Sequence, residues 1–160
     1  MKKTIVILLL LGLEMFGTQL QAEFISSENL STATLRNVLS ENYGTKIEDD
    51  EITVSTASGK IFLKVISLKK VKILRFEAFY SKYDKWTIQE LISLANKWND
   101  SKRFLRVSID PKDGSSTCDY YLICVKGIDG ENVIASMEWF VSLQNRWAEF
   151  VINNGKTTDE

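Results

Sequence analysis

The stretch from Leu94 to Gly114, "LANKWNDSKRFLRVSIDPKDG", concentrates the side chains of this chain that could do chemistry. It holds an indole, two carboxamides, a Lys-Arg pair and three aspartates. Histidine is absent from the whole sequence. That absence excludes imidazole acid–base catalysis, His-dependent nucleophilic triads and His-ligated zinc. An enzyme built on this sequence would have to use carboxylates, Lys, Tyr or Cys.

Two aspartates of this stretch, Asp110 and Asp113, could act together with Asp119, which follows shortly after it. The turn residues of "DPKDG" predict a tight reversal between two strands, which brings these acids near each other across a hairpin. Carboxylate-pair catalysis needs two acids in one cleft, and a turn on the rim is not an enclosed pocket. A calcium loop would need a bidentate Glu farther on, which is missing. We expect no catalytic residue, metal or cofactor, and a carboxylate-based hydrolase is the least favoured function.

The remaining polar residues of this stretch have local structural explanations. Trp98 completes the apolar side of a helix, Asn99 ends that helix, and Arg103 stands where a strand begins. The alternative is a binding site, and the sequence leaves both possibilities open. The candidate residues for an interaction site or a hydrogen-bonded structural joint are Asn96, Trp98, Asn99, Arg103, Asp110 and Asp119.

The two cysteines, Cys118 and Cys124, both fall within one predicted strand. Six residues at about 3.3 Å each separate them by about 20 Å, far beyond the reach of a disulfide. We therefore expect two unbridged thiols on the same face of the strand, buried rather than reactive.

A basic and aromatic region precedes this stretch. Its cations predict either a solvated face with a lysine-protected edge or a docking surface for an acidic partner or anionic headgroups. The basic residues are Lys60, Lys64, Lys69, Lys70, Lys72 and Arg75, and the aromatic ones are Phe62, Phe79, Tyr80, Tyr83 and Trp86. The aromatic side chains are explained equally well by an interface and by core packing. The candidate docking surface is Lys64, Lys69, Lys70, Phe79 and Trp86.

Hydrophobic periodicity predicts the elements that position these residues. A helical period near residues 31–43 gives way to an alternating period that continues to Tyr80. After it, Thr87-x-x-Glu90 forms a capping-box pattern that predicts the start of a second helix. The expected order is a helix, a three-stranded meander, a helix at 87–100, strands at 103–110 and 116–125, and a long last helix. This pattern, α-βββ-α-ββ-α, predicts an α+β fold with an antiparallel sheet and helices packed on one face. We expect a single domain over residues 23–154 and a flexible tail over 155–160.

The first residues have the order of a secretory signal peptide. A basic start, Met1 to Lys3, precedes an apolar run of about nine residues, and the segment closes near Ala22. A membrane-spanning helix needs about twenty apolar residues, so a retained anchor is disfavoured. Cleavage there would remove two Lys and one Glu, leaving 18 basic and 20 acidic residues and a net charge of −2. We expect a periplasmic or secreted protein that does not bind nucleic acid, with at most transient membrane contact.

The segment "LANKWNDSKRFLRVSIDPKDGSSTCDYYLICVKGIDGENVI" resembles the YbjN-domain family. The positions that carry the resemblance are Asn96, Trp98, Asn99, Lys102, Arg103, Phe104, Asp110, Gly114, Asp119 and Gly127. The resemblance covers about residues 30–152 and implies a fold similar to type III secretion chaperones, which are compact α+β domains that often pair. Family members are labelled sensory transduction regulators, and no enzymatic activity is implied. The chain departs from the family in having "KGIDGEN" where Gly-Gly is common, and in its leader segment.

These observations predict an exported, non-catalytic module that binds a protein or acts like a chaperone. Its partner is not identified by the sequence, and a homodimer is expected. The alternative is a periplasmic protein that binds a small ligand or lipid in a cavity between sheet and helices.

Overall fold

A computed structural model describes residues 23–69, 71–102 and 104–156. The elements in chain order are β1 (Phe24–Ser26), α2 (Thr32–Ser40), β2 (Gly44–Glu48), β3 (Glu51–Thr56), β4 (Gly59–Leu68), β5 (Val71–Tyr80), α3 (Ile88–Ser101), β6 (Arg106–Ile109), β7 (Ser116–Cys124), β8 (Gly127–Asp129) and α4 (Gly130–Ile152). The expected leader segment and the last four residues lie outside the described residues, as do Lys70 and Arg103.

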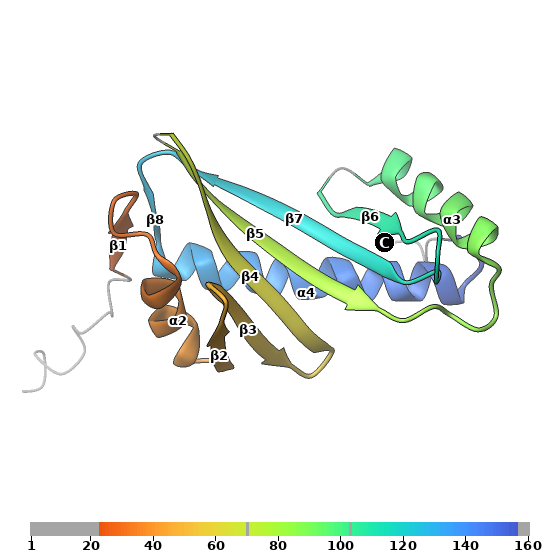
Figure 1. The fold of residues 1–160 in the computed structure, drawn as a ribbon, viewed down its shortest axis with the longest axis horizontal. Coiled ribbons are helices and arrows are strands. Elements are labelled where there is room, and N and C mark those ends of the chain that lie inside the picture. Colours follow the sequence, from red (N-terminus) through yellow and green to blue (C-terminus); the bar gives the residue numbers. More distant parts are fainter. Residues whose placement is uncertain (1–22, 70, 103, 157–160) are drawn as a thin grey trace, which may run out of the picture.

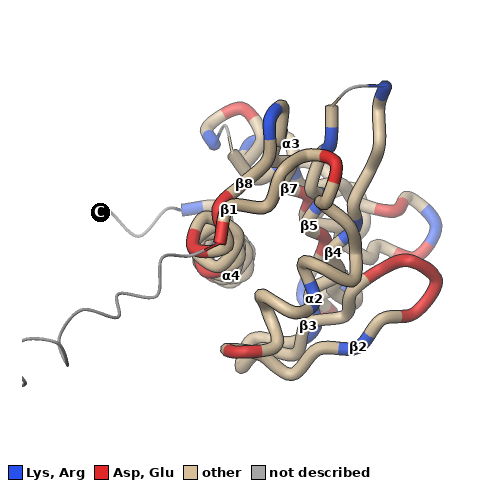
Figure 2. Tube along the Cα trace, turned by 90° about the vertical axis from the view of Figure 1, so that its left-hand side faces the viewer, with Lys and Arg blue, Asp and Glu red and all other residues tan. Residues whose placement is uncertain are grey.

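Six strands form one antiparallel sheet in the order β2-β3-β4-β5-β7-β6, and β1 pairs with β8 in a separate two-stranded sheet. The long helix α4 runs along the inner face of the curved sheet (Figures 1 and 2). The helix α2 packs at the β2 end of the sheet and against α4, while α3 packs beside β6. The predicted class, an α+β domain with an antiparallel sheet and covering helices, is confirmed.

Alternation along the strands creates the two faces of the sheet. Ile61 and Leu63 of β4 and Leu74 and Phe76 of β5 are fully buried against the helices. The stripe of α4 that meets them includes Phe140, whose ring lies 5.9 Å from that of Phe76. Burying such side chains contributes about 1.5–3 kcal/mol each, so this interface holds the domain together. The opposite face of the sheet, here called the outer face, has none of the described helices packed on it and is the face seen in Figure 1.

The expected three-stranded meander is wrong in one respect, because the segment contains four strands. The missed element is the hairpin of β2 and β3, which turns at Asp49 and Asp50. Both residues have positive φ, 49° and 61°, as a tight hairpin turn requires. The acidic run "EDDE" contains no Gly or Asn, so the sequence carries no clear signal for a hairpin turn at this point.

Three other elements differ from the predicted ones: the start of β6, the short strands β1 and β8, and the residues after α4. The strand expected from residue 103 begins at Arg106, which is the first residue of β6 that pairs with β7. The short strands β1 and β8 were missed, and their pairing needs Gly127, since a Cβ there would lie 2.1 Å from the carbonyl oxygen of Ile25. Gly155, expected in a flexible tail, is buried and closes the end of α4 with a 2.8 Å hydrogen bond to the carbonyl of Phe150.

Candidate functional site

The C-terminal end of α3 is joined to the edge of the sheet by two neighbouring side chains. The capping box of Thr87 and Glu90 starts this helix as predicted, and Trp98 and Asn99 stand near its end. The indole Nε1 of Trp98 donates to the carbonyl of Leu105 at 3.1 Å. The carboxamide of Asn99 donates to the carbonyl of Val107 at 2.8 Å and accepts from its amide at 2.9 Å.

These three hydrogen bonds go to the edge of β6 that faces away from β7. An edge strand leaves its outward amide and carbonyl groups unpaired, and unprotected edges invite pairing with other chains. The Asn99 side chain replaces a neighbouring strand at Val107, and Trp98 does the same for the carbonyl of Leu105. The geometry of Trp98 and Asn99 is therefore that of a structural joint between helix and sheet. Asn96, on the same helix, is exposed.

Asp110 and Asp113 are occupied by the hairpin between β6 and β7. The Asp110 carboxylate accepts from the amide of Lys112 at 2.7 Å, and that of Asp113 accepts from the amide of Ser115 at 2.8 Å. The hydrogen bond from Ser115 lowers the pKa of Asp113. Gly114, with a φ of 77°, completes the turn. Both carboxylates thus stabilise the turn that the sequence predicted.

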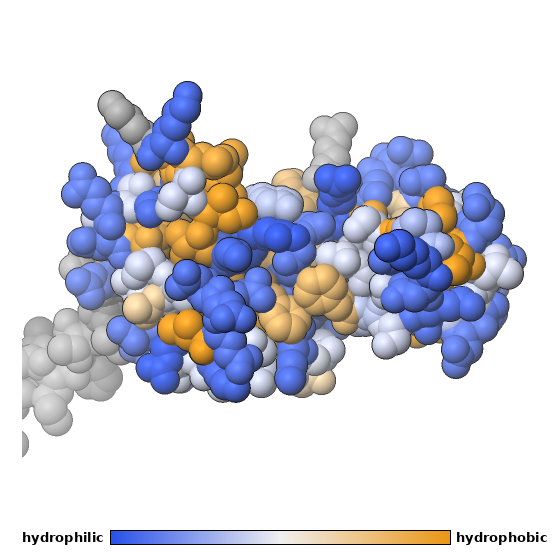
Figure 3. Space-filling view, viewed as in Figure 1, coloured by the Kyte–Doolittle hydropathy of each residue, from blue (hydrophilic) through white to orange (hydrophobic). Residues whose placement is uncertain are grey.

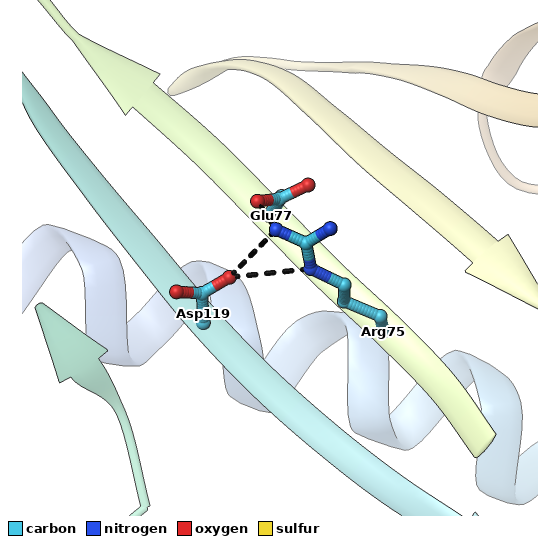
Figure 4. A network of polar contacts seen from close by, with 3 residues as sticks. All are labelled: Arg75, Glu77 and Asp119. Atoms are coloured by element: carbon cyan, nitrogen blue, oxygen red, sulfur yellow. Dashed lines mark hydrogen bonds and ion pairs between the residues drawn. The ribbon is translucent and has the colours of Figure 1, made fainter. Parts of the chain in front are cut away.

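Asp119 lies elsewhere, on the outer face of the sheet, in a cluster with Arg75 and Glu77 (Figure 4). The Arg75 guanidinium is 3.3 Å from the Asp119 carboxylate and also pairs with Glu77. Glu77 and Asp119 stand directly opposite each other on β5 and β7, and both are largely buried. Like charges in opposite positions repel, so the shared arginine is what allows both acids there.

The sequence did not identify Glu77, and it placed Arg75 in a basic patch. The cluster forms only because β5 and β7 are neighbours in this register, and that pairing joins residues 44 positions apart. No spacing rule within one segment could have found it. Asp110, Asp113 and Asp119, expected near one another, face different partners.

Rows of apolar side chains occupy one end of the outer face. Register places Leu68 beside Val71, and Ile66 beside Ile73, which in turn neighbours Ile123 on β7. Leu68 is 55% exposed and Ile123 is 65% exposed. Figure 3 shows the resulting group of hydrophobic atoms where β4, β5 and β7 end together, at the upper left. These five residues are called the outer apolar patch below.

The expected docking residues are only partly brought together. Lys64 and Phe79 lie on the outer face, and Lys69 lies in the turn between β4 and β5, which is basic in Figure 2. Phe79 is exposed and meets Phe62 edge-on at 5.4 Å. Trp86 instead packs partly against the core, with the ammonium of Lys85 5.1 Å from its ring.

Two further aromatic side chains of the region also pack against the core. Tyr80 and Tyr83 are half-buried there, and burial raises the pKa of both phenols. Core packing, one of the two explanations that the sequence left open for the aromatic residues, therefore applies to Trp86, Tyr80 and Tyr83.

The cysteines lie as the sequence predicted. Cys118 and Cys124 are unbridged and buried on the face of β7 that meets the core. Burial, aided by the neighbouring Asp119, raises the pKa of the Cys118 thiol to about 12. Burial also raises the pKa of Cys124. Both thiols are therefore protonated and unreactive at neutral pH.

Several hollows lie at the surface. An open groove of about 630 Å³ lies between the end of α3 and β7, and a second hollow of about 510 Å³ lies between β1, α2 and α4. Within the described ranges, no group of three or more Cys, Asp or Glu residues could hold a metal ion. Over the same part of the chain, no helix has the length and apolarity needed to cross a membrane.

Comparison with known proteins identifies the family. The sequence profile named YbjN, described as "Putative bacterial sensory transduction regulator", matches residues 31–153. The chain belongs to the YbjN family. The fold is similar to the crystal structure of YbjN, "a putative transcription regulator from E. coli", with a TM-score of 0.50 and 14% identity over 77% of this chain and 89% of that chain. At this identity the likeness shows the fold alone, and no curated protein matches the sequence.

The described family positions are divided among the joint, the hairpin and the charged cluster on the outer face. Trp98 and Asn99 hold α3 to β6, Asp110 and Gly114 form the hairpin turn, and Asp119 binds Arg75. Arg103 lies outside the described residues. In this member of the YbjN family, Trp98, Asn99, Asp110 and Gly114 therefore hold β6 against α3 and shape the turn that follows it.

Proposed function

We propose that this YbjN-family protein is a non-catalytic binding module that holds a protein partner on the outer face of its sheet. The outer apolar patch is the observation that carries the proposal. Contiguous exposed apolar side chains on a soluble domain are typical of interaction sites. Here they come from three neighbouring strands of one sheet, which suits a preformed docking surface.

The surroundings of the patch indicate the chemistry of the partner. Lys64 stands in the next row of the sheet, and Lys69 lies in the adjoining turn. The chain as a whole is slightly acidic, with a net charge of −1, so this concentration of positive charge is local. A partner that presents apolar side chains flanked by carboxylates would match both features.

Binding without catalysis is supported by how the acidic side chains are used. The carboxylates of Asp110 and Asp113 cap a turn, and that of Asp119 is paired with an arginine. Catalytic acids need free access to a substrate and a cleft that excludes water. The family description as a regulator is compatible with a protein that acts by binding.

The place of action that we propose is outside the cytoplasm, in the periplasm or as a secreted protein. The proposal rests on the basic start and short apolar run of the first 22 residues. N-terminal sequencing of protein recovered from a periplasmic fraction would test it. A mature chain that begins near Glu23 is the expected result, and recovery only from the cytoplasm with Met1 intact would contradict it.

The ligand-binding alternative has less support. The space between sheet and α4 is filled by large side chains such as Phe76, Phe140 and Trp147. The hollow beside α2 is lined partly by apolar groups and partly by Glu23, Glu41 and Glu131. Its acidic rim would repel anionic headgroups.

Partner capture with a matched pair of variants tests the proposed function. Leu68→Glu places a charge in the outer apolar patch, while Ile152→Glu changes a similarly exposed residue, 61% exposed, at the end of α4. We expect Leu68→Glu to weaken binding of the captured protein by roughly tenfold or more, since apolar area is lost and a repulsive charge is added. Equal affinities of the two variants, measured by titration calorimetry, would contradict the proposal.

A further inference from the structure

The strand β7 has an open edge along its second half. Strand β6 pairs only with Ser116 to Asp119, which leaves Tyr120 to Cys124 bonded to β5 on one side. Among the described residues no strand covers the other side of this segment. In Figure 1 this is the upper margin of β7, to the left of the point where β6 begins.

The direction of the main-chain groups follows from the hydrogen bonds around β6. The amide of Asp110 donates to the carbonyl of Ser115, while Val107 directs both of its groups to Asn99, away from β7. Main-chain groups alternate in direction along an antiparallel pair, so the amides and carbonyls of Arg106 and Asp119 point toward each other. The same alternation carried along β7 points the amides and carbonyls of Tyr121 and Ile123 to the open edge.

Two hollows border this edge from end to end. The groove beside α3 reaches Asp119, Tyr120 and Tyr121, and a hollow of about 310 Å³ beside β8 reaches Leu122, Ile123 and Cys124. Exposed apolar side chains accompany them: Tyr121 is 48% exposed and Ile123 is 65% exposed. The exposed rings of Phe104 and Trp139, 6.3 Å apart, add aromatic surface beside the first groove.

The two ends of the edge carry opposite charge. The groove beside α3 is lined by Lys102, Arg106 and Asp119, whose carboxylate is already paired with Arg75, and the hollow beside β8 is lined by Asp129. Antiparallel pairing of two identical strands reverses one of them, so the basic end of each copy would meet the acidic end of the other. The surface is therefore complementary to itself under a two-fold axis.

We propose that β7 pairs with β7 of a second copy of this chain, about a two-fold axis at Leu122, to form one continuous sheet across a homodimer. The main chain of Tyr121 would exchange hydrogen bonds with that of Ile123 in the second copy, and Ile123 would do the same with Tyr121 of the second copy. This pairing satisfies the outward main-chain groups and covers the exposed side chains along the edge. It is separable from the protein partner proposed above, because the pairing uses main-chain groups at the edge of the sheet and shares only Ile123 with the outer apolar patch.

Light scattering of the protein purified from expression of the complete sequence tests the dimer. Tyr121→Pro removes one outward amide from each copy, and Tyr121→Val keeps the amide and changes only the side chain. We expect a dimer for the wild type and for Tyr121→Val, and a dissociation constant raised roughly 10- to 100-fold for Tyr121→Pro. A wild type that is monomeric at about 100 μM, or a Tyr121→Pro variant that is equally dimeric, would overturn the proposal.

A cross-linking experiment tests the register and does not depend on proline being tolerated. In the proposed pairing, Leu122 faces its own copy as a non-hydrogen-bonded pair, about 4.5 Å apart at Cα, within disulfide range. We expect Leu122→Cys, with Cys118 and Cys124 replaced by Ala, to form a disulfide-linked dimer on mild oxidation. Thr117→Cys in the same background, on a part of β7 covered by β6, should remain unlinked. Equal cross-linking of the two variants would overturn the proposed register.

The Leu68→Glu variant separates this inference from the proposed function. Its substitution lies on the outer face, two strands away from the β7 edge. We expect it to remain dimeric while it loses the protein partner. Loss of the dimer in Leu68→Glu would count against pairing through the edge, whereas unchanged partner binding would count only against the outer apolar patch.

Discussion

Single side chains in this protein substitute for missing main-chain partners. Asn99 is the clearest case, because its carboxamide gives Val107 both hydrogen bonds that a neighbouring strand would supply. Asn96 lies three residues earlier on the same helix, is exposed, and offers a control of identical chemistry. The difference between the two lies only in what each side chain reaches.

Replacing Asn99 by Ala should lower the free energy of unfolding by about 1–3 kcal/mol, because the amide and carbonyl of Val107 lose their partners. Asn96→Ala should change it by less than about 0.5 kcal/mol. Urea titration followed by circular dichroism measures both. Equal effects of the two substitutions would show that the joint contributes no stability.

Cys118 links the stability of the fold to alkaline pH. Its pKa is raised from 9.0 to about 12 in the folded chain, so above pH 9 the unfolded chain releases a proton that the folded chain keeps. The folded state therefore binds more protons, and its stability falls as pH rises from 9 toward 12. Below pH 9 this contribution is fully present.

We expect the free energy of unfolding of Cys118→Ala to fall less steeply above pH 9 than that of the wild type. Tyr80 and Tyr83, whose pKa values are also raised by burial, will keep some alkaline dependence in both proteins. Denaturant titrations at a series of alkaline pH values provide the slopes. Parallel slopes would exclude the Cys118 thiol as a source of the loss.

At the scale of elements, the pairing of β5 with β7 creates the charged cluster on the outer face. Two largely buried acids stand opposite each other, and one arginine on β5 neutralises part of their charge. The Arg75 side chain is itself 31% exposed, which weakens the interaction relative to a fully buried ion pair. The charged cluster is therefore compatible with the register of β5 and β7, but it contributes little to the stability of that register.

Arg75→Leu should destabilise the protein by about 1–3 kcal/mol at neutral pH, because it leaves Glu77 and Asp119 facing each other without a cation. Adding Glu77→Gln should recover part of the loss, since only one charge then remains. Thermal unfolding of the wild type, the single variant and the double variant measures the coupling. A double variant that is less stable than the single variant would contradict this account.

At the scale of the whole molecule, an aromatic cluster ties the α3–β6 unit to α4. The ring of Trp98 lies 5.7 Å from that of Trp147 and 5.4 Å from that of Phe150, both on α4. The two indoles are almost fully buried, yet they differ in one respect. Trp98 has a hydrogen-bond partner, whereas Nε1 of Trp147 has none among the described residues.

Trp98→Phe should therefore cost more stability than Trp147→Phe. Both lose ring volume, but only the first leaves the carbonyl of Leu105 without its donor, which adds about 1–3 kcal/mol. Denaturant unfolding followed by far-ultraviolet circular dichroism compares them without relying on indole emission. A larger loss for Trp147→Phe would indicate that packing, not the hydrogen bond, dominates this joint.

The sequence by itself determined the α+β class, the antiparallel sheet, the capping box at Thr87, the hairpin at Asp110 to Gly114 and the unbridged cysteines. Each of these depends on local periodicity, cap and turn chemistry, or on the length of chain between two residues. The β2–β3 hairpin was missed because Asp49 and Asp50 are an uncommon pair for its turn. The strands β1 and β8 were missed because three residues carry no periodic signal.

Only the tertiary structure decided the contacts that cross between distant segments. It showed that Asn99 completes a sheet edge, that Asp119 meets Arg75 and Glu77, and that five apolar residues from three strands adjoin on the outer face. It also showed that β6 stops short of covering β7. Register between strands sets all of these, and register results from the packing of whole faces against the helices, which no single segment of sequence contains.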